Sequence, residues 1–433
     1  MNFLVLPHQL FDPKYLPNNI TKIYLYEHPQ YFTKYKYNKK RILMHRASMK
    51  YYQDLLKKKK YNIEYIEFSE KLPNSEWTLF DPIDKIKIPK STYIESPNFL
   101  LTKEQYIEYR QKKSTKFFFN AFYMWGKQQI NIIPDVKSQD RENRKTMPTT
   151  LKIPDIPSNE IGQDTKYINE AIKYVEKHFK NNYGDTEGYQ FPISHTTARQ
   201  WLSDFIEKKL NNFGDYQDYI LENQPYLYHS LLSTSINIGL INPTEIIDLI
   251  RPLKSKTNIN SYEGYIRQLF WREYQRFCYI HFDFSKLNYF GNNKKLTSSW
   301  YNGTTGIIPV DDAIKMAFKY GYLHHILRLM VIGNWMNLSG IDPREGFKWF
   351  MEFSCDSYEW VMEQNVLDMV FCVSGGQTMR KPYISSSNYI IKMSSYKKGD
   401  WSDKWDQAYQ NFLKDKKDKL IPRFAYTFAI RYK

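Results

Sequence analysis

Residues 321–343, GYLHHILRLMVIGNWMNLSGIDP, combine a largely apolar pattern with two adjacent histidines and an arginine. If this segment is helical, spacings of four, three and four place these side chains on one face: His324, Arg328, Val331 and Trp335. The neighbouring rows are mostly apolar, so we expect a buried helix. One interpretation is a core helix whose polar groups are simply hydrogen-bonded, and the other is the wall of a functional site.

The composition indicates a folded protein of more than one domain. The chain has 433 residues, with 42% hydrophobic and 25% charged residues, which suggests two or three domains. Lys and Arg exceed Asp and Glu by 62 − 46 = 16, which favours a polyanionic partner such as nucleic acid, although an AT-rich genome would also raise the lysine content.

Cysteine usage and hydropathy predict the compartment. The three cysteines are widely spaced, which fits a reducing compartment, and Cys278 with His281 lacks the second ligand pair of a metal site. No run of 18 apolar residues and no basic leader occur, so we expect neither secretion nor a membrane span.

The N-terminal region alternates strand-like and helical patterns. Short runs rich in β-formers occupy residues 3–7, 22–27, 62–68 and 77–80, and residues 39–60 have helical spacing. This order predicts an α/β domain with a mainly parallel sheet over residues 1–125. No glycine precedes Gly126, which excludes the glycine-rich turns of ordinary dinucleotide dehydrogenases and P-loop nucleotidases from this region.

The rest of the chain is predicted to be a connector followed by a large all-α domain. Residues 126–165 are polar and rich in proline, as expected of a connector, and residues 166–433 have few strand signals. The helical periodicity is clearest in these segments: 194–211, 225–238, 244–252, 261–280, 310–337, 343–363 and 402–414.

Three segments of the helical region carry chemistry of their own. Gly214 lies in a polar stretch that can expose backbone N–H groups, and Ser230 and Ser233 could meet a phosphate, although such hydroxyls are commonly helix caps. In residues 261–277, Trp271 shares a face with Gln268 and other polar residues, an arrangement suited to stacking on a base.

Long motifs in succession resemble the photolyase and cryptochrome superfamily, and within it the bacterial photolyase-related branch that includes the iron-sulfur 6-4 photolyases. These motifs are FGDYQDYI, LYHSLLSTSINIGL, YEGYIRQLFWREY, GYLHHILRLMVIGNWMNLSGIDP, YEWVMEQNVLDM and TMRKPYISSSNYIIKMSSY. The resemblance continues toward the N-terminus through YEHPQYF, MHRASMKYY, ESPNFLLT and RENRKTMP. It therefore covers nearly the whole chain.

The resemblance implies a U-shaped FAD inside the helical domain, which passes an electron in the light to a pyrimidine lesion flipped out of DNA. Residues implied to hold the phosphates and ribityl chain are Phe213, Gly214, Tyr216, His229, Ser230, Leu232 and Ser233. Residues implied to lie between flavin and lesion are Glu263, Arg267, Gln268, Trp271 and Arg272, with Trp271 stacking on the flipped bases. Arg328 and the 358–365 segment, including Asn365, would line the isoalloxazine ring.

The same resemblance implies a catalytic pair, an electron relay and an antenna site. His324 and His325 match the pair that protonates a 6-4 lesion, a suitable task for groups that titrate near neutrality. Trp300 (or its neighbour Tyr301), Trp349 and Tyr389 match the aromatic relay that photoreduces flavin. A lumazine-type antenna chromophore would bind near Glu27 and Tyr31.

Two features depart from the branch. Relatives bind a four-iron cluster with four cysteines, but here the first position falls near Pro309 and no cysteine follows Cys372, so we expect no cluster and no metal. Asp368 stands where relatives have glycine, and Met362 and Glu363 are expected near flavin N5, which affects the contacts to the ring.

The leading hypothesis is a light-driven photolyase for 6-4 photoproducts; the alternatives are a cyclobutane dimer photolyase and a cryptochrome-like blue-light receptor. We expect UV-damaged DNA as the partner, no protein or membrane partner, a monomer, and a cytoplasmic location with access to the nucleoid or nucleus. Basic residues expected to face the duplex are Lys112, Lys113, Lys116, the 141–145 segment, Arg380 and Lys381.

Overall fold

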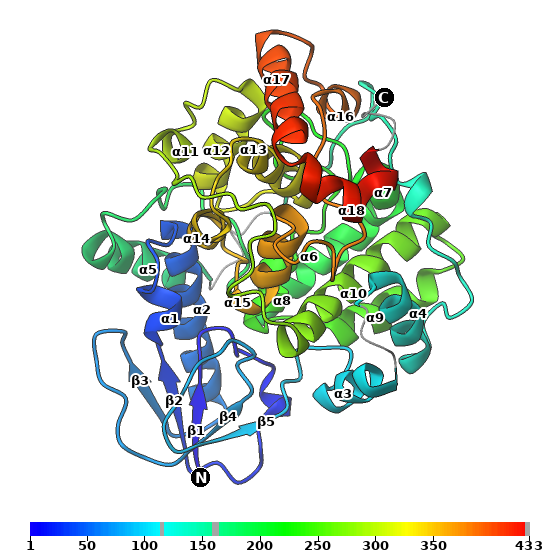
Figure 1. Cartoon of the computed structure of the whole chain (residues 1–433). Helices are drawn as coiled ribbons and strands as arrows, with labels where there is room; N and C mark the ends of the chain where they lie inside the picture. The colour runs from blue at the N-terminus through cyan, green and yellow to red at the C-terminus, as the bar shows by residue number, and fades with distance from the viewer. Residues whose placement is uncertain (113–116, 158–163, 429–433) are drawn as a thin grey trace.

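A parallel sheet forms one end of the molecule (Figure 1). In this computed structural model, residues 1–112, 117–157 and 164–428 are described, so Lys113 and Lys116 lie outside the described residues. The five strands pair in the order β3-β2-β1-β4-β5 and all pairings are parallel, which confirms the predicted α/β region. The strands are β1 Asn2–Val5, β2 Lys22–Tyr26, β3 Ile63–Ile66, β4 Trp77–Phe80 and β5 Ser91–Ile94.

The sheet is buried on both faces, as its sequence requires. Alternate residues point to opposite sides, so Phe3 and Val5 join the main core while Leu4 joins a smaller cluster on the other face. Helix α2 (Lys39–Lys58) is capped by the Asn38 side chain and packs against α5 (Asp164–His178). The edge strand β5 was not predicted. Two of its four residues are exposed and the other two are half-buried, so the strand shows no alternation.

Helices make up most of the remaining chain, which confirms the predicted all-α region. The longest, α10 (Ile259–His281), packs against α4 (Phe119–Gln129), α7 (Leu210–Tyr216), α15 (Glu359–Met362) and the π-helix η5 (Glu363–Val370). The other α-helices are α1 Pro29–Phe32, α3 Lys103–Lys112, α4 Phe119–Gln129, α6 His195–Lys208, α7 Leu210–Tyr216, α8 Ser233–Ile238, α9 Pro243–Ile250, α11 Ser299–Asn302, α12 Ile308–Tyr320, α13 Asn334–Leu338, α14 Pro343–Phe353, α15 Glu359–Met362, α16 Asn388–Lys392, α17 Asp400–Asp415 and α18 Lys417–Phe428. Short 3₁₀ turns are η1 Pro13–Tyr15, η2 Asp140–Glu142 and η3 Arg251–Leu253.

The predicted continuous helix over residues 310–337 is wrong. Helix α12 ends before Gly321, whose φ of +63° and close approach to Cys355 suit only glycine. His324 precedes the next helical turn, and residues Leu327–Gly333 form the π-helix η4. Each π turn holds an extra residue, so the regular face proposed for His324, Arg328, Val331 and Trp335 does not exist.

Two other segments that were predicted to be continuous helices are only partly helical. The 343–363 segment breaks between α14 and α15 and continues into a second π-helix, η5 (Glu363–Val370). The 225–238 segment is helical only from Ser233. The two π-helices pack together, and a Cβ on Gly333 would lie 2.6 Å from Val370 Cγ1. Irregular helical turns of this kind are frequent at functional sites.

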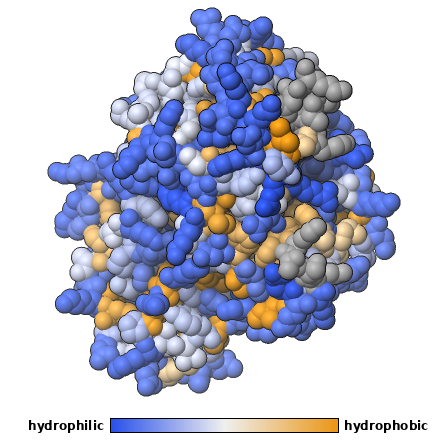
Figure 2. All heavy atoms as spheres, viewed as in Figure 1, coloured by the Kyte–Doolittle hydropathy of each residue, from blue (hydrophilic) through white to orange (hydrophobic). Residues whose placement is uncertain are grey.

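The main hydrophobic core is continuous from the sheet into the helices. Hydrophilic residues dominate the face shown in Figure 2, with smaller hydrophobic areas between them. Within the described residues, no helix is long and apolar enough to cross a membrane.

Candidate functional site

A cavity of about 970 Å³ lies within the helical region. Its volume is at the upper end of the roughly 300–1,000 Å³ typical of small-molecule sites, so a large ligand can enter. Its walls come from both π-helices, from α10, and from loops before α8 and α16. Most of the predicted site residues line it: Phe213, His229, Ser230, Ser233, Arg267, Gln268, Trp271, Arg272, His325, Arg328, Asn365 and Tyr389.

Four other residues that were predicted to hold the cofactor do not line the cavity. Gly214 donates its N–H to Ser261 Oγ over 2.9 Å, and a Cβ there would lie 2.7 Å from the backbone of Asn260. Glu263 accepts hydrogen bonds from the Tyr123 hydroxyl and from the backbone of Gln139. Tyr216 packs on Tyr228, and Leu232 is fully buried. These four residues support the wall and do not form its inner surface.

An ion pair joins the two sides of the cavity. Arg328 Nη2 of η4 lies 2.9 and 3.1 Å from the two carboxylate oxygens of Asp356, which also accepts a hydrogen bond of 2.7 Å from Ser233 Oγ. Burial alone would raise the pKa of Asp356, but the Arg328 charge and these hydrogen bonds hold it below 3.8. Asp356 lies in the break between α14 and α15, and it was not predicted as a site residue because a continuous helix was expected there.

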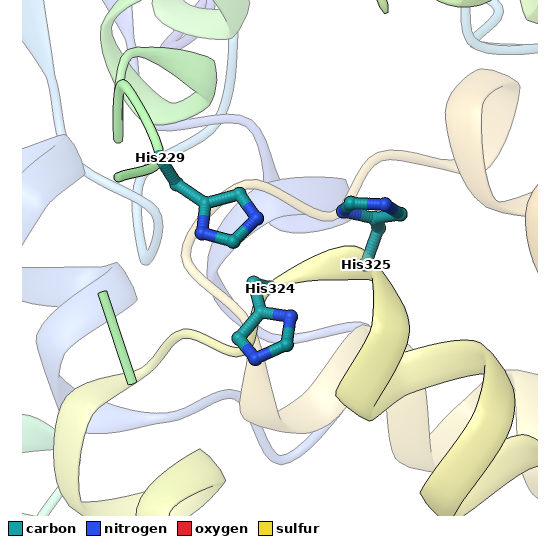
Figure 3. A group of neighbouring side chains, drawn as sticks. All are labelled: His229, His324 and His325. Atoms are coloured by element: carbon teal, nitrogen blue, oxygen red, sulfur yellow. The ribbon is translucent and has the colours of Figure 1, made fainter. Parts of the chain in front are cut away.

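Three histidines meet beside the cavity (Figure 3). The rings of His229 and His324 stack with centroids 4.8 Å apart and an angle of 13° between planes. His324 is 1% exposed, and neither ring nitrogen has a hydrogen-bond partner within the described residues. Burial, reinforced by neighbouring positive groups, lowers the pKa of His324 well below 6.5, and burial lowers that of His229 to about 3. Both rings are therefore neutral at physiological pH.

His325 lines the cavity, and it differs from the other two histidines because it has an acidic partner. Its Nε2 lies 3.1 Å from Asp218 Oδ1, and its side chain is 35% exposed. Asp218 also accepts a hydrogen bond of 3.3 Å from Arg144 Nε. Burial acts to raise the pKa of Asp218, but the contacts with His325 and Arg144 lower it below 3.8. The carboxylate can thus stabilise a protonated His325.

The histidine cluster is poorly arranged for a metal ion. One ligand atom from each ring lies within 4.8 Å of the others. However, the lone pairs of an imidazole lie in its ring plane, and the nearly parallel planes of His229 and His324 do not direct them to a common point. We assign no metal to this cluster.

Charged side chains gather at the end of the cavity that holds His325. Asp140 pairs with Arg144 over 3.2 Å and with Arg267 over 2.7 Å. Exposed Arg141, Arg380 and Lys381 also belong to the cavity lining. This rim is positively charged and polar, as a nucleic-acid entrance requires.

Trp271 and Arg272 form a further part of the wall on α10. Trp271 stacks on Phe119 with ring centroids 3.8 Å apart, which holds the indole at the cavity edge. Arg272 donates hydrogen bonds to Asn237 Oδ1 and to the Asn98 carbonyl, while its second terminal nitrogen, Nη2, is buried without a partner in the described structure. Burial lowers the pKa of Arg272 to about 10.

Trp300 and Trp349 of the predicted relay are in contact, whereas no ring contact joins either of them to Tyr389 among the described residues. Trp349 Nε1 donates a hydrogen bond of 2.7 Å to the Trp300 carbonyl. The aromatic rings that contact Trp349 within the described residues are those of phenylalanines 318, 350 and 353, and Phe350 lies at the cavity wall. Tyr389 instead lines the cavity directly.

The predicted antenna residues lie in a closed polar network. Both carboxylate oxygens of Glu27 are occupied: Oε1 by Arg46 and Tyr65, and Oε2 by Tyr174 and the Phe68 backbone, at 2.6–3.1 Å. The hydroxyl of Tyr31 donates to Asp84 over 3.1 Å, and neither Glu27 nor Tyr31 lines the cavity. These residues do not fit an antenna chromophore.

The residues that depart from the family pattern leave the cavity intact. Asp368 lies behind the wall, where it accepts hydrogen bonds from the Ser374 backbone and the Thr378 hydroxyl. Met362 lines the cavity as expected, whereas the carboxylate of Glu363 lies 3.7 Å from Lys85 Nζ. All three cysteines are buried and free.

Comparison with known proteins agrees with the fold and the cavity. Residues 3–86 and 74–191 match the family of deoxyribodipyrimidine photo-lyase-related proteins, and residues 265–423 match the FAD binding domain of DNA photolyase. A (6-4) photolyase of Agrobacterium fabrum is 35% identical over 297 residues, which cover 65% of this chain and 58% of that protein. An uncharacterised protein of Acanthamoeba polyphaga mimivirus is 54% identical over 95 residues, covering 22% of this chain and 77% of the viral protein.

Two solved structures share the fold. A bacterial class III photolyase from Agrobacterium tumefaciens superimposes with a TM-score of 0.59 at 14% identity, covering 90% of this chain and 86% of that one. An archaeal photolyase from Sulfolobus tokodaii with two FAD molecules gives a TM-score of 0.53 at 13% identity, covering 97% and 89%. The chain therefore belongs to the photolyase and cryptochrome superfamily, in its photolyase-related branch.

Proposed function

We propose that this protein is a light-driven DNA repair lyase that binds FAD in the helical cavity and reverts 6-4 photoproducts. The observation that carries the proposal is the position of His325, which faces the cavity with Asp218 at 3.1 Å behind it. The 35% identity to a (6-4) photolyase supports the same substrate class.

The cavity residues fit FAD. Arg328, Ser230 and Asn365 provide polar groups on the cavity lining. Arg272 contributes a guanidinium whose Nη2 has no hydrogen-bond partner among the described residues, and Met362 and Val366 provide apolar surface for a ring system. Arg328, oriented by Asp356, would contact the flavin ring, and Trp271 would stack on a flipped base. When bound, reduced flavin supplies an electron to the lesion in the light.

His325 is the proton donor in this proposal, and His324 positions it. A group that donates a proton to the lesion must reach the cavity and must be stabilised when charged, and Asp218 meets the second requirement. His324 is buried, neutral and stacked on His229, so it cannot readily carry the charge. The carboxylate of Asp218 also orients the imidazole of His325.

Repair assays with variants test this assignment. Photoreduced wild-type protein under blue light should restore pyrimidines in an oligonucleotide that carries one 6-4 photoproduct. His325→Ala should lower that repair by about 10²–10⁴-fold, the usual contribution of a general acid, while FAD content stays unchanged. His178→Ala, at an exposed histidine of α5 that does not line the cavity, is the control and should retain repair.

The alternatives give different results in the same assay. A cyclobutane dimer photolyase needs no acid, so repair of that lesion alone, unaffected by His325→Ala, would support this alternative. A cryptochrome-like receptor would bind FAD and repair neither lesion. Equal loss of both activities in His325→Ala would show that the histidine is structural.

Duplex DNA is the expected partner at the positive rim. Arg141, Arg380 and Lys381 are exposed at the cavity lining and can contact phosphates near a flipped nucleotide. Affinity for lesion DNA should therefore fall steeply as salt increases.

A further inference from the structure

Helix α15 belongs both to the cavity wall and to the contact with the α/β region (Figure 1). Its last two residues, Val361 and Met362, line the cavity, and the chain continues directly into η5, which also lines it. Its first two residues, Glu359 and Trp360, instead form hydrogen bonds with the α/β region. A displacement of the start of α15 would therefore move the part of the wall that is expected beside the flavin ring.

The start of α15 is capped by a residue that is distant in the sequence. The N-cap residue of the helix, Tyr358, makes no capping hydrogen bond with its own side chain. Instead, Asp84 Oδ1, in the loop after β4, accepts a hydrogen bond of 2.9 Å from the backbone N–H of Trp360. Asp84 Oδ2 accepts one of 3.1 Å from the Tyr31 hydroxyl, and Asp84 is 4% exposed, so the carboxylate has a fixed orientation. A side-chain acceptor at this place stabilises a helix start, whose N–H groups have no partner within the helix.

The loop that carries Asp84 has a strained backbone. Ile83 has a φ of +65°, in the left-handed region that is unfavourable for a β-branched residue. Hydrogen bonds fix the backbone on both sides, since the N–H of Ile83 donates to Asp81 Oδ1 over 2.9 Å and that of Asp84 donates to the Pro82 carbonyl over 2.7 Å. Backbone strain of this kind is concentrated at functional sites. Here the strained residue directly precedes the carboxylate that reaches α15.

Two ion pairs also join this part of the wall to the α/β region. Glu359 of α15 accepts a hydrogen bond from Lys34 Nζ, and Glu363, the first residue of η5, lies 3.7 Å from Lys85 Nζ. The side chains of Lys34 and Lys85 are 36% and 60% exposed, so water weakens both pairs. The buried hydrogen bond from Asp84 is therefore the stronger connection.

We propose that Asp84 is a positioning residue for the flavin site, which holds the start of α15 and thereby places Met362 and the adjoining wall against the flavin ring. The inference rests on the proposed function, since FAD is the ligand that this wall would contact. Asp84 does not line the cavity, so it acts only through α15. The α/β region thereby supports the flavin site without holding a chromophore of its own.

The test measures FAD affinity by equilibrium dialysis and the visible circular dichroism of bound FAD, which reports the surroundings of the flavin ring. Asp84→Ala removes the acceptor of the Trp360 N–H. It should weaken FAD binding about tenfold, equivalent to about 1.4 kcal/mol and comparable to the loss of a helix cap, and it should change the dichroism. Asp84→Asn keeps an acceptor oxygen and should restore both signals to wild-type values. Wild-type affinity and dichroism in Asp84→Ala would overturn the inference.

Two controls separate positioning from a general loss of stability. Lys87→Met, at an exposed residue of the same loop, should leave both signals unchanged. Glu27→Gln should lower the stability of the α/β region without changing FAD affinity, because Glu27 forms its hydrogen bonds away from α15. Equal weakening of FAD binding in Asp84→Ala and Glu27→Gln would overturn the inference.

A second variant decides if Asp84→Ala does not fold. Asp84→Glu retains the carboxylate but moves it by one methylene, so it should also change the dichroism, and an unchanged spectrum would overturn the inference. These outcomes leave the proposed function intact. Wild-type protein that binds no FAD would refute the proposed function itself.

Discussion

The family resemblance predicts a chromophore both in the helical cavity and near Glu27, but the polar groups of the two places differ in their hydrogen bonding. In the wall of the cavity, Arg272 Nη2 has no hydrogen-bond partner among the described residues, and the wall encloses about 970 Å³. Around Glu27, each carboxylate oxygen already has two donors from the chain itself. Buried polar groups normally have hydrogen-bond partners. An unpaired buried group in the wall of a cavity therefore indicates a ligand, whereas a network in which every group is paired indicates a structural role.

The largest expected effect comes from breaking the cavity. Arg328→Ala leaves Asp356 buried without its cation, which should cost about 3–5 kcal/mol of unfolding free energy and nearly all bound FAD. Denaturant unfolding and the flavin absorbance of the purified protein measure these two losses. Arg328→Lys keeps the charge without the paired contact and should fall between wild type and Arg328→Ala. If Arg328→Ala retained its full FAD content, this ion pair would not contribute to flavin binding.

The second effect concerns Asp84, the partner of Tyr31 in the closed region. Burial, together with the nearby charge of Glu359, raises the pKa of Asp84 from 3.8 to about 7. A raised carboxyl pKa means that the folded state holds the proton more tightly than the unfolded state does. Wild-type stability should therefore fall as pH rises from about 4 to about 7 and change little from this group above that, a loss of roughly 2–4 kcal/mol.

Asp84→Asn tests this sign directly. The amide stays neutral, and the Tyr31 hydroxyl can turn to accept a hydrogen bond from it. The variant should therefore lose less stability than wild type between pH 4 and pH 7 in urea unfolding. Parallel pH profiles for the two proteins would show that Asp84 is ionised in the fold.

A smaller effect is expected at Glu27. Glu27→Gln places an amide NH₂ among groups that donate hydrogen bonds, which should cost about 1–3 kcal/mol. Arg46 keeps its contacts with Glu67 and Glu170. The absorption spectrum should not change, because the chain itself already fills the hydrogen-bonding capacity of Glu27. Glu67→Gln, at a partner of the same arginine that is more exposed than Glu27, is the matched control and should cost no more than about 1 kcal/mol.

The fold was largely predictable because its signals are local. The strand at residues 22–27 and the helix at residues 39–60 follow from β-formers and helical spacing, and both occur at those places. The π-helices were not predictable, because a regular 3.6-residue period is assumed in reading a helical face, and η4 and η5 each depart from it.

The site was predictable only where a motif supplied it. His325, Arg328 and Trp271 line the cavity, whereas Asp356 and Asp218 were missed. Nothing in sequence spacing pairs Asp218 with a histidine 107 positions away or Asp356 with Arg328, since these contacts arise from tertiary packing. The predicted antenna site shows the opposite limit of prediction from sequence. Glu27 is the residue that the resemblance requires, but its neighbours already fill its hydrogen-bonding capacity.

The contrast between an open and a closed site is tested most directly by counting chromophores. Purified protein is denatured, and the released small molecules are separated and quantified by chromatography and mass spectrometry against the chain concentration. The account predicts one FAD for each chain and no lumazine-type or other second chromophore. A chain that releases no FAD after saturation with it, or one that releases a second chromophore lost in Glu27→Gln, would contradict the account.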